Sequence, residues 1–492
     1  MRRGLSSQRL SGNIPTPAGA VSAPRPNPAP GVGRAGPNGP VPAFLNLSGW
    51  GRFGAVPSVV YRPESWRRVE AVVGAAPEGS VLARGLGRSY GDSAVNASGA
   101  VLITERLDRI LAFDEERRTV TCEGGAPLAR LLAFLVPRGW FLPVVPGTRF
   151  VSVGGALAAD VHGKNHHVDG TIGRHVEELT LLTASGELLR CSPDENPEAF
   201  DATVGGMGLT GVILSARLRI LPIETPFVKV VKRRARDLDE LLSVLCEEEH
   251  LSRYSVAWID GLARGRRLGR GVLIRGDHLL RSELPARRAA PGLLLERPGP
   301  TVPLDAPPFL LGPAGVTAFN AVYYAAARAG TTLSGLAPFF FPLDGIGAWN
   351  RLYGRRGFVQ YQALVPRQEA AEACRKLLEE IGRERAASFL AVFKTTGAEG
   401  RGLLSFPRQG VTLALDVPNV GERLRPLARR LDEIVLRHGG RLYLAKDALT
   451  NVASFAAMYP RLGAFRAERA RLDPRGRFSS DQARRLGLVE AP

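Results

Sequence analysis

The chain has 492 residues, of which 45% are hydrophobic and 23% charged, and its formal net charge is +18. This length and apolar content suffice for two or more domains with substantial cores, and no apolar run approaches the ~20 residues that a membrane-spanning helix needs. The basic residues are spread along the chain rather than interleaved with aromatic residues, so we expect contact with phosphates or acidic lipid headgroups rather than with nucleic acid.

The first 41 residues are rich in Pro, Gly, Ala and Ser and contain hardly any large apolar side chains. Such a segment cannot offset the entropy lost on ordering, so it predicts a disordered leader. No apolar core follows the first three residues, which argues against a secretory signal. The four cysteines are scattered and show no spacing typical of a metal site or a disulfide framework, so we expect no metal.

Three glycine-rich clusters follow, at residues 83–92, 146–167 and 203–211. The first comes after an apolar, strand-like run, but its Gly-x-Gly-x-x-x-Gly spacing differs from the dinucleotide fingerprint and no long amphipathic helix follows, which disfavours a Rossmann turn. The second contains three of the seven histidines. Because glycine lets the backbone turn sharply or approach a ligand closely, and backbone amides can cradle a pyrophosphate, the clusters predict the wall of a cofactor site.

Secondary-structure patterns divide the rest of the chain. Between residues 55 and 225, short β-rich runs such as 101–104, 119–122 and 212–220 alternate with the glycine loops, as in a mixed α+β domain. From residue 357 the pattern becomes strand, helix, strand, and then repeats. The predicted strands are 358–365, 389–393, 411–417 and 441–444, and the predicted helices are 369–381 and the segment that contains residues 427–435. Two such units predict a sheet that is covered by helices on one face.

Lysine usage is informative, because only six of the 65 basic residues are lysines and the other 59 are arginines. Lys164, Lys394 and Lys446 lie inside glycine- or aromatic-rich motifs. Arginine cannot replace lysine where a compact, desolvated ammonium or a shiftable pKa is needed. These three lysines are therefore candidates for a functional site.

Several motifs together resemble the flavoprotein oxidoreductases of the vanillyl-alcohol-oxidase type, most closely the branch that oxidises decaprenylphosphoryl-β-D-ribose. The similar segments are 85–92, 160–167, 254–258, 357–362, 392–394, 443–447, 457–460 and 478–486. The resemblance implies an α+β, two-domain fold with an antiparallel, helix-covered sheet in the substrate domain. The implied domains are an FAD-binding domain at 42–226 that is completed by 441–492, and a substrate-binding domain at 227–440.

A basic, Gly- and Pro-rich region at about residues 261–313 interrupts the implied substrate domain. Its poor periodicity is consistent with a mobile, solvated loop. The alternative is a lid that docks on a membrane surface and admits a lipid-linked substrate.

The resemblance also implies a reaction: FAD-dependent oxidation of the ribose 2′-hydroxyl of decaprenylphosphoryl-β-D-ribose to a ketone. A separate NAD(P)H-dependent short-chain reductase would complete the epimerisation to the arabinose donor for cell-wall arabinan. The implied location is peripheral, at the inner membrane, on its cytoplasmic or periplasmic side. Two alternatives stay open: a soluble alditol or aldonolactone oxidase, and a flavin-binding protein without catalysis.

The resemblance assigns roles to individual residues. The catalytic candidates are Lys446, Tyr90 and His162, which can supply a cation and shared protons near the reacting carbon. Those expected to bind FAD are Arg84, Gly85, Leu86, Gly87, Arg88, Ser89, Tyr90, Pro146, Gly147, Thr148, Ser152, Gly154, Gly155, Ala158, His162, Gly163, Asn165, Gly206, Gly208, Leu209, Ile213 and Lys446. Those expected to bind the substrate are Lys164, Gln360, Gln362, Lys394 and Trp258.

Two positions depart from the patterns of relatives. Arg88 stands where covalently flavinylated sugar oxidases commonly carry histidine, so we expect FAD to be bound noncovalently. Ala414 is the nearest match to a cysteine that some close relatives carry on the strand at 411–417. Cysteine has no obvious part in alcohol oxidation, so this change affects the expected response to thiol-reactive inhibitors rather than the activity.

Overall fold

A computed structural model describes residues 42–97, 99–285, 299–307 and 311–489. The predicted leader at 1–41 and the parts of the predicted basic loop at 286–298 and 308–310 lie outside the described residues.

Two sheets form around the glycine-rich clusters. In the four-stranded sheet, of order β1-β2-β4-β3, β4 is parallel to both of its neighbours and β1 is antiparallel to β2. The five-stranded sheet, of order β5-β6-β10-β8-β9, is antiparallel throughout. The strands are β1 (Ala43–Leu47), β2 (Val56–Tyr61), β3 (Val81–Arg84), β4 (Ala100–Ile103), β5 (Ile110–Asp114), β6 (Thr119–Glu123), β8 (Val176–Leu182), β9 (Leu188–Cys191) and β10 (Val212–Arg219). The accompanying helices are α1 (Trp66–Ala75), α2 (Leu128–Leu135), α3 (Val153–Ala158), α4 (His166–Asp169) and α5 (Pro197–Thr203).

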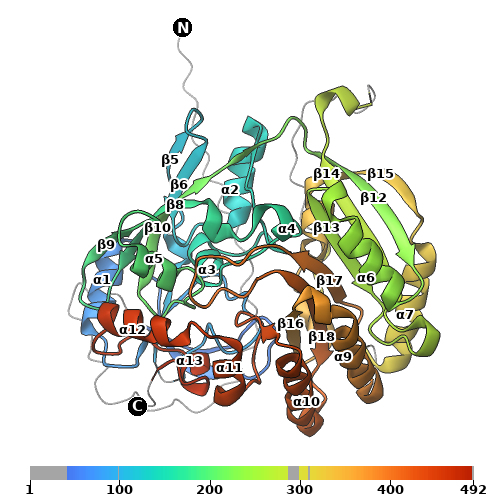
Figure 1. Ribbon diagram of the computed structural model, residues 1–492. Helices are drawn as coiled ribbons and strands as arrows, with labels where there is room; N and C mark the ends of the chain where they lie inside the picture. The colour runs from blue at the N-terminus through green and yellow to red at the C-terminus, as the bar shows by residue number, and fades with distance from the viewer. Residues whose placement is uncertain (1–41, 98, 286–298, 308–310, 490–492) are drawn as a thin grey trace.

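The third large sheet has eight strands in the order β15-β12-β14-β13-β17-β18-β16-β19, and every pairing is antiparallel. The strands are β12 (Phe227–Ala235), β13 (Tyr254–Ile259), β14 (Gly271–His278), β15 (Gly330–Gly335), β16 (Phe358–Val365), β17 (Ala391–Thr396), β18 (Gly410–Pro418) and β19 (Arg441–Leu442). Helices α6 (Leu238–Glu247), α9 (Ala370–Glu384) and α10 (Leu424–Arg437) cover one face, and the other face turns toward the N-terminal sheets (Figure 1). The predicted α+β fold class with an antiparallel, helix-covered sheet is confirmed.

Residues 271–278 differ from the prediction of a loop, because they form β14 between β12 and β13. Two arginines of this region are ion-paired: Arg270, just before β14, lies 2.7 Å from Asp260, and Arg275, within β14, lies 3.0 Å from Glu248. Gly276 interrupts the hydrophobic pattern, and a Cβ there would lie 2.7 Å from the Phe339 ring. Close packing against Phe339 therefore requires glycine at this position. The same glycine made the strand hard to recognise in the sequence.

The C-terminal segment returns to the N-terminal sheets after β19, which itself pairs with β16. It contains α11 (Val452–Met458), α12 (Leu462–Leu472) and α13 (Asp481–Arg485). Phe478 forms an isolated parallel bridge with Val81, and α12 packs on α5. The Arg485 guanidinium lies 2.7 Å from Asp92 and 2.8 Å from Asp447, so it ties the first glycine-rich loop to this segment.

Two further helices, α7 (Pro313–Ala326) and α8 (Leu336–Phe340), connect β14 to β16 on either side of β15. Among the described residues, no helix is both long and apolar enough to cross a membrane.

Candidate active site

A pocket of about 330 Å³ lies between the N-terminal sheets and the open face of the eight-stranded sheet. Three separate parts of the chain form its walls: the loop at 84–90, the segment at 145–164, and strands β13, β16, β17 and β18, with Lys446 added from the C-terminal return. Its volume is within the range of small-molecule and cofactor pockets.

The first loop rests directly on the start of α3. A Cβ at Gly85 would lie 1.9 Å from the Ser152 Oγ, so only glycine allows this approach. Ser152 caps α3 by accepting a hydrogen bond from the Gly155 backbone N–H at 3.2 Å. A Cβ at Gly147 would meet no atom within 4 Å, which leaves room for a ligand at that wall.

One end of the pocket contains Lys446 and Tyr90. The Lys446 Nζ lies 3.8 Å from the centre of the Tyr90 ring, and that ring packs edge-on against Phe358. Burial lowers the pKa of Lys446 to about 7, and the positive charge of Lys394 lowers it too, whereas the negative charge of Asp416 raises it. Burial raises the pKa of Tyr90 well above its ordinary value, so its phenol stays protonated and can donate a hydrogen bond.

Gln360 and Gln362 lie on β16, in the row of side chains that faces the pocket. The Gln360 Nε2 donates to Asp416 Oδ1 at 2.5 Å, and the Tyr353 hydroxyl donates to Asp416 Oδ2 at 3.0 Å. Burial raises the pKa of Asp416 to about 7. Asp416 was not predicted from the sequence, although it shares the strand and the face of Ala414 and pairs in register with Gln360.

His162 is buried and neutral. Burial lowers its pKa well below the ordinary value, with further lowering by Lys394, His166 and Lys446. Its Nε2 lies 3.0 Å from the Gln362 amide nitrogen, which donates to it, so the ring proton is on Nδ1. That Nδ1 has no hydrogen-bond partner among the described residues. A buried donor without a partner is costly, so it fits a site in which a bound cofactor supplies the acceptor.

Two more lysines add positive charge. Lys164 Nζ donates to the carbonyl oxygens of Phe339 (2.8 Å) and Phe340 (3.0 Å), and its pKa is lowered to about 7 by burial and by the charge of Lys394. Burial also lowers the pKa of Lys394, to about 8. Ammonium groups that repel one another in a buried pocket favour an anionic ligand.

The structure brings most of the predicted site residues together. Those that line the pocket are Arg84, Gly85, Leu86, Gly87, Arg88, Ser89, Tyr90, Pro146, Gly147, Thr148, Ser152, Gly155, Ala158, His162, Gly163, Lys164, Gln360, Gln362, Lys394 and Lys446. Those that do not line it are Gly154, Asn165, Gly206, Gly208, Leu209, Ile213 and Trp258.

The residues outside the lining have other contacts. Asn165 donates to the Pro143 carbonyl at 2.8 Å, and a Cβ at Gly206 would lie 2.0 Å from the Ala202 carbonyl oxygen. Trp258 donates its ring N–H to the Phe389 carbonyl at 2.9 Å. From the third glycine-rich cluster, Met207 lines the pocket. Other lining residues absent from the prediction include Trp50, Val256, Trp349, Val392, Ala414 and Tyr443.

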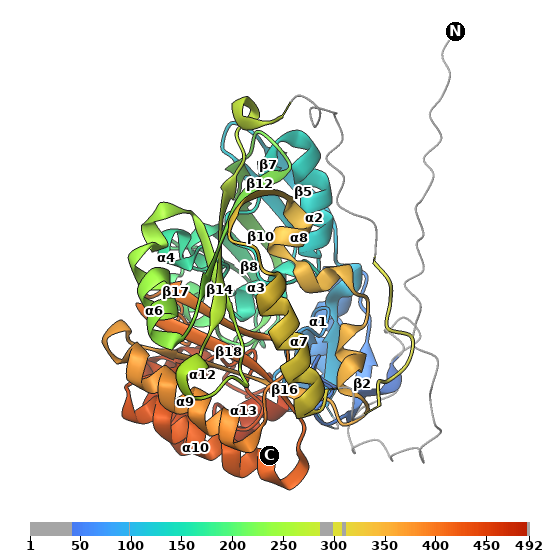
Figure 2. The same ribbon diagram turned by 90° about the vertical axis from the view of Figure 1, so that its right-hand side faces the viewer.

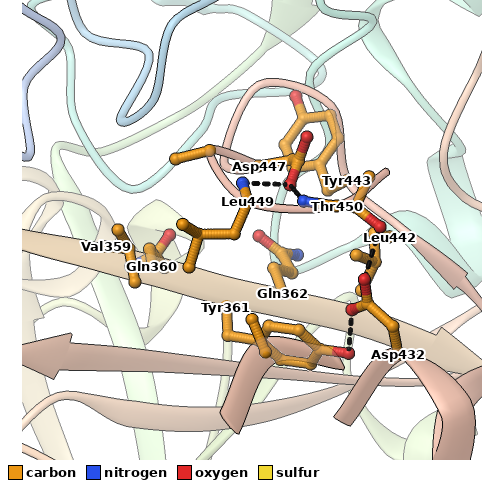
Figure 3. A pocket seen from close by; sticks show the side chains of 12 residues that line it. Val359, Gln360, Tyr361, Gln362, Asp432, Leu442, Tyr443, Asp447, Leu449 and Thr450 are labelled. Atoms are coloured by element: carbon orange, nitrogen blue, oxygen red, sulfur yellow. Dashed lines mark hydrogen bonds between the residues drawn. The ribbon is translucent and has the colours of Figure 1, made fainter. Parts of the chain in front are cut away.

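A separate cavity of about 20 Å³ lies behind β16 (Figure 3). There the Tyr361 hydroxyl donates to Asp432 at 3.0 Å, and Thr450 donates to the same carboxyl group. This volume suffices for about one water molecule and not for a cofactor. The residues around this cavity therefore support β16 and are not part of the candidate active site.

Comparison with known proteins gives two family matches. Residues 57–192 match the FAD binding domain, and residues 416–486 match D-arabinono-1,4-lactone oxidase. The predicted FAD cofactor is thereby confirmed.

Individual relatives cover different shares of the chain. The decaprenylphosphoryl-β-D-ribose oxidase of Mycolicibacterium smegmatis is 40% identical over 452 residues, which cover 90% of this chain and 97% of the relative. A Streptomyces coelicolor protein of uncharacterised activity is 39% identical over 372 residues, which cover 73% of this chain and all of the relative. The L-gulonolactone oxidase of Bos taurus is 30% identical over 206 residues, which cover 40% of this chain and 46% of the relative.

Proposed function

The chain belongs to the FAD-dependent oxidase family of decaprenylphosphoryl-β-D-ribose oxidase, and from this premise we propose that it oxidises the ribose 2′-hydroxyl of a polyprenyl-phosphoryl ribose to a ketone. The observation that carries the proposal is the convergence of three partly buried lysines on a pocket that the FAD-binding region and the eight-stranded sheet both line. A sugar phosphodiester offers the negative charge and the hydroxyl groups that such a pocket can bind.

When bound, FAD would accept the hydride that leaves C2′, and the proton of the 2′-hydroxyl would leave to solvent. We propose that the Lys446 ammonium holds the 2′-oxygen and the negative charge that develops next to it. Tyr90 donates a hydrogen bond in the same region, and the His162 Nδ1–H orients the cofactor. Lys394 and Lys164 bind the phosphate, while Gln360 and Gln362 bind the ribose hydroxyls.

We propose that FAD is bound noncovalently. The Arg88 guanidinium stacks on the Trp50 ring at 3.9 Å, at the position where covalently flavinylated relatives carry histidine. Release of the yellow cofactor on acid precipitation tests this assignment, and cofactor that stays with the pellet contradicts it.

The proposed product, a 2′-ketone, becomes an epimerised alcohol only if hydride is returned to the opposite face. A separate NAD(P)H-dependent short-chain reductase is therefore the proposed partner, and the two steps yield the arabinose donor for cell-wall arabinan. Because the proposed substrate is lipid-linked, we propose that the protein lies peripherally at the inner membrane, on its cytoplasmic or periplasmic side.

A second candidate function is a soluble alditol or aldonolactone oxidase, which the match of residues 416–486 favours. Turnover distinguishes the candidates when FAD-loaded protein is given farnesylphosphoryl-β-D-ribose, alditols and aldonolactones separately with an electron acceptor. We expect a product two hydrogens lighter from the lipid alone. Turnover of only the free polyols or lactones supports the second candidate, and turnover of none supports a flavin-binding protein without catalysis.

A further inference from the structure

Helix α7 differs from the other long helices on the surface. None of its 14 residues is charged, whereas seven of the 15 residues of α9 and six of the 14 residues of α10 are charged. In the sequence, no charged residue occurs from 306 to 327. Figures 1 and 2 show α7 on the outside of the molecule. A surface helix of this composition lacks the polar face that water normally solvates.

One narrow stripe anchors α7 to the sheet. Val316 is 1% exposed, the Asn320 side chain donates to Asp260 at 2.8 Å, and the Tyr324 hydroxyl donates to the Ala235 carbonyl at 3.2 Å. The adjacent face is apolar and open: Phe319 is 49% exposed and Val322 is 68% exposed. Together with Tyr323, which is 37% exposed, we call this face the α7 apolar face.

The α7 apolar face is continuous with the wall of the candidate active site. The Tyr323 ring lies 4.5 Å from the Trp258 ring, and the Phe319 ring lies 5.7 Å from the Phe389 ring. The neighbours of these partners, Val256 and Leu390, line the pocket. Aromatic contacts therefore connect this side of the pocket wall to α7.

Cations lie beside the C-terminal half of α7. The exposed Arg234 guanidinium lies 5.7 Å from the Tyr324 ring, and Arg328 lies two residues after the end of the helix. Neither arginine has an acidic partner among the residues that the structure describes. Apolar residues flanked by unpaired arginines are complementary to anionic headgroups above an acyl layer.

We propose that the α7 apolar face docks on an anionic lipid bilayer, and that the polyprenyl chain of the substrate passes along it from the pocket into the membrane. This inference rests on the proposed function for the identity of the substrate. The helix is too short to cross a bilayer, so it lies in the interface with Phe319, Val322 and Tyr323 toward the acyl chains.

The test uses the full chain loaded with FAD, sedimented with vesicles of phosphatidylcholine and phosphatidylglycerol. The variant F319Q/V322Q removes apolar surface from α7 without changing the net charge. The control is L188Q, which changes an apolar residue on β9 that is 56% exposed. We expect F319Q/V322Q to partition onto the vesicles about ten-fold more weakly than the wild type, and L188Q to partition like the wild type. We expect R234Q/R328Q to lose the preference for phosphatidylglycerol.

Activity separates this inference from the proposed function. With a long-chain substrate in vesicles, F319Q/V322Q should reduce its flavin more slowly than the wild type, and with farnesylphosphoryl-β-D-ribose in solution, whose chain is shorter, this difference should be smaller. Equal vesicle partitioning of F319Q/V322Q and the wild type would overturn the docking surface. If F319Q/V322Q bound vesicles like the wild type but no longer passed its product to the proposed reductase partner, the docking surface would also be overturned. The α7 apolar face would then be a protein-docking surface. If the wild type oxidised neither lipid, the proposed function would be overturned instead. The vesicle partitioning of the wild type and F319Q/V322Q would still test the α7 apolar face.

Discussion

Gln360 and Asp416 face each other across β16 and β18, with the Gln360 amide nitrogen 2.5 Å from the Asp416 Oδ1. This contact turns the Gln360 carbonyl oxygen away from Asp416. The same carboxylate raises the pKa of Lys446, against the effect of burial. Asp416 therefore acts as a positioning residue: it orients an amide of the pocket and stabilises the charge of Lys446.

The variant Asp416→Asn should lower the pKa of Lys446 further, because the nearby negative charge is lost while burial and the Lys394 charge persist. We expect the decline of flavin reduction with rising pH to begin at a lower pH than in the wild type. Rapid-mixing measurements of the reduction rate across pH provide the test. Asp432→Asn is the matched control, since Asp432 is also a buried carboxyl group with a pKa raised to about 7, but it lies on the helix-covered side. Equal profiles for Asp416→Asn and the wild type would contradict the role of Asp416.

Lys446→Ala should lose flavin reduction while keeping the fold. Removing a buried cation from the position where charge develops typically slows a reaction by about 100-fold or more. The measurement is the anaerobic reduction rate at saturating lipid substrate, and Lys376→Ala, which changes a surface lysine on α9, is the control. Normal reduction by Lys446→Ala would remove this residue from the reaction.

The wild-type reduction rate should fall as the pH rises through about 7. The pKa of Lys446 is lowered to about 7, so its ammonium is charged below this pH and neutral above it. In Lys446→Arg the decline should disappear, even if the reaction is slower, because arginine stays charged across this range. A rate that rises through about pH 7 would show instead that Lys446 acts in its neutral form.

His162→Leu should weaken FAD binding, because it removes the Nδ1–H that has no partner in the described part of the chain. A neutral hydrogen bond of about 1 kcal/mol corresponds to roughly five-fold in affinity. Titration of cofactor-free protein with FAD measures the effect. His162→Asn should recover much of the loss, since its side-chain amide N–H can take the place of Nδ1–H. Unchanged affinity in His162→Leu would contradict a cofactor contact at this atom.

Arg485→Met should destabilise the protein, since it leaves the carboxylates of Asp92 and Asp447 without their shared partner. Because this ionic group is partly buried, removing its arginine costs about 1–3 kcal/mol. Thermal unfolding should show a lower midpoint than the wild type, while Arg471→Met, at an exposed ion pair on α12, should unfold like the wild type. Equal midpoints for both variants would show that the Arg485 link contributes little.

Local patterns predicted much of the fold. The predicted strand at 358–365 coincides with β16, whose eight residues are all buried. The helices now seen as α9 and α10 were predicted from apolar residues at helical spacing. β14 was not predicted, since its pairing with β12 and β13 depends on strands far away in the sequence, and its glycine is explained only by the neighbouring Phe339.

Sequence motifs predicted many of the residues that line the pocket wall. They did not predict which residues tertiary packing would cover or bring next to the pocket. Trp258 and Val256 share a face of β13, yet only Val256 lines the pocket, because Trp258 is covered by Tyr323 of α7. Asp416 carries no motif of its own, and its significance comes from the strand pairing that places it next to Gln360. Such relationships arise from the three-dimensional structure and have no local signal in the sequence.

The most direct test of the proposed activity is an anaerobic absorbance spectrum of the FAD-loaded protein before and after addition of farnesylphosphoryl-β-D-ribose. We predict that the visible flavin band bleaches with this lipid and not with free alditols. A flavin that stays oxidised with the lipid but bleaches with alditols or aldonolactones would contradict the proposed substrate.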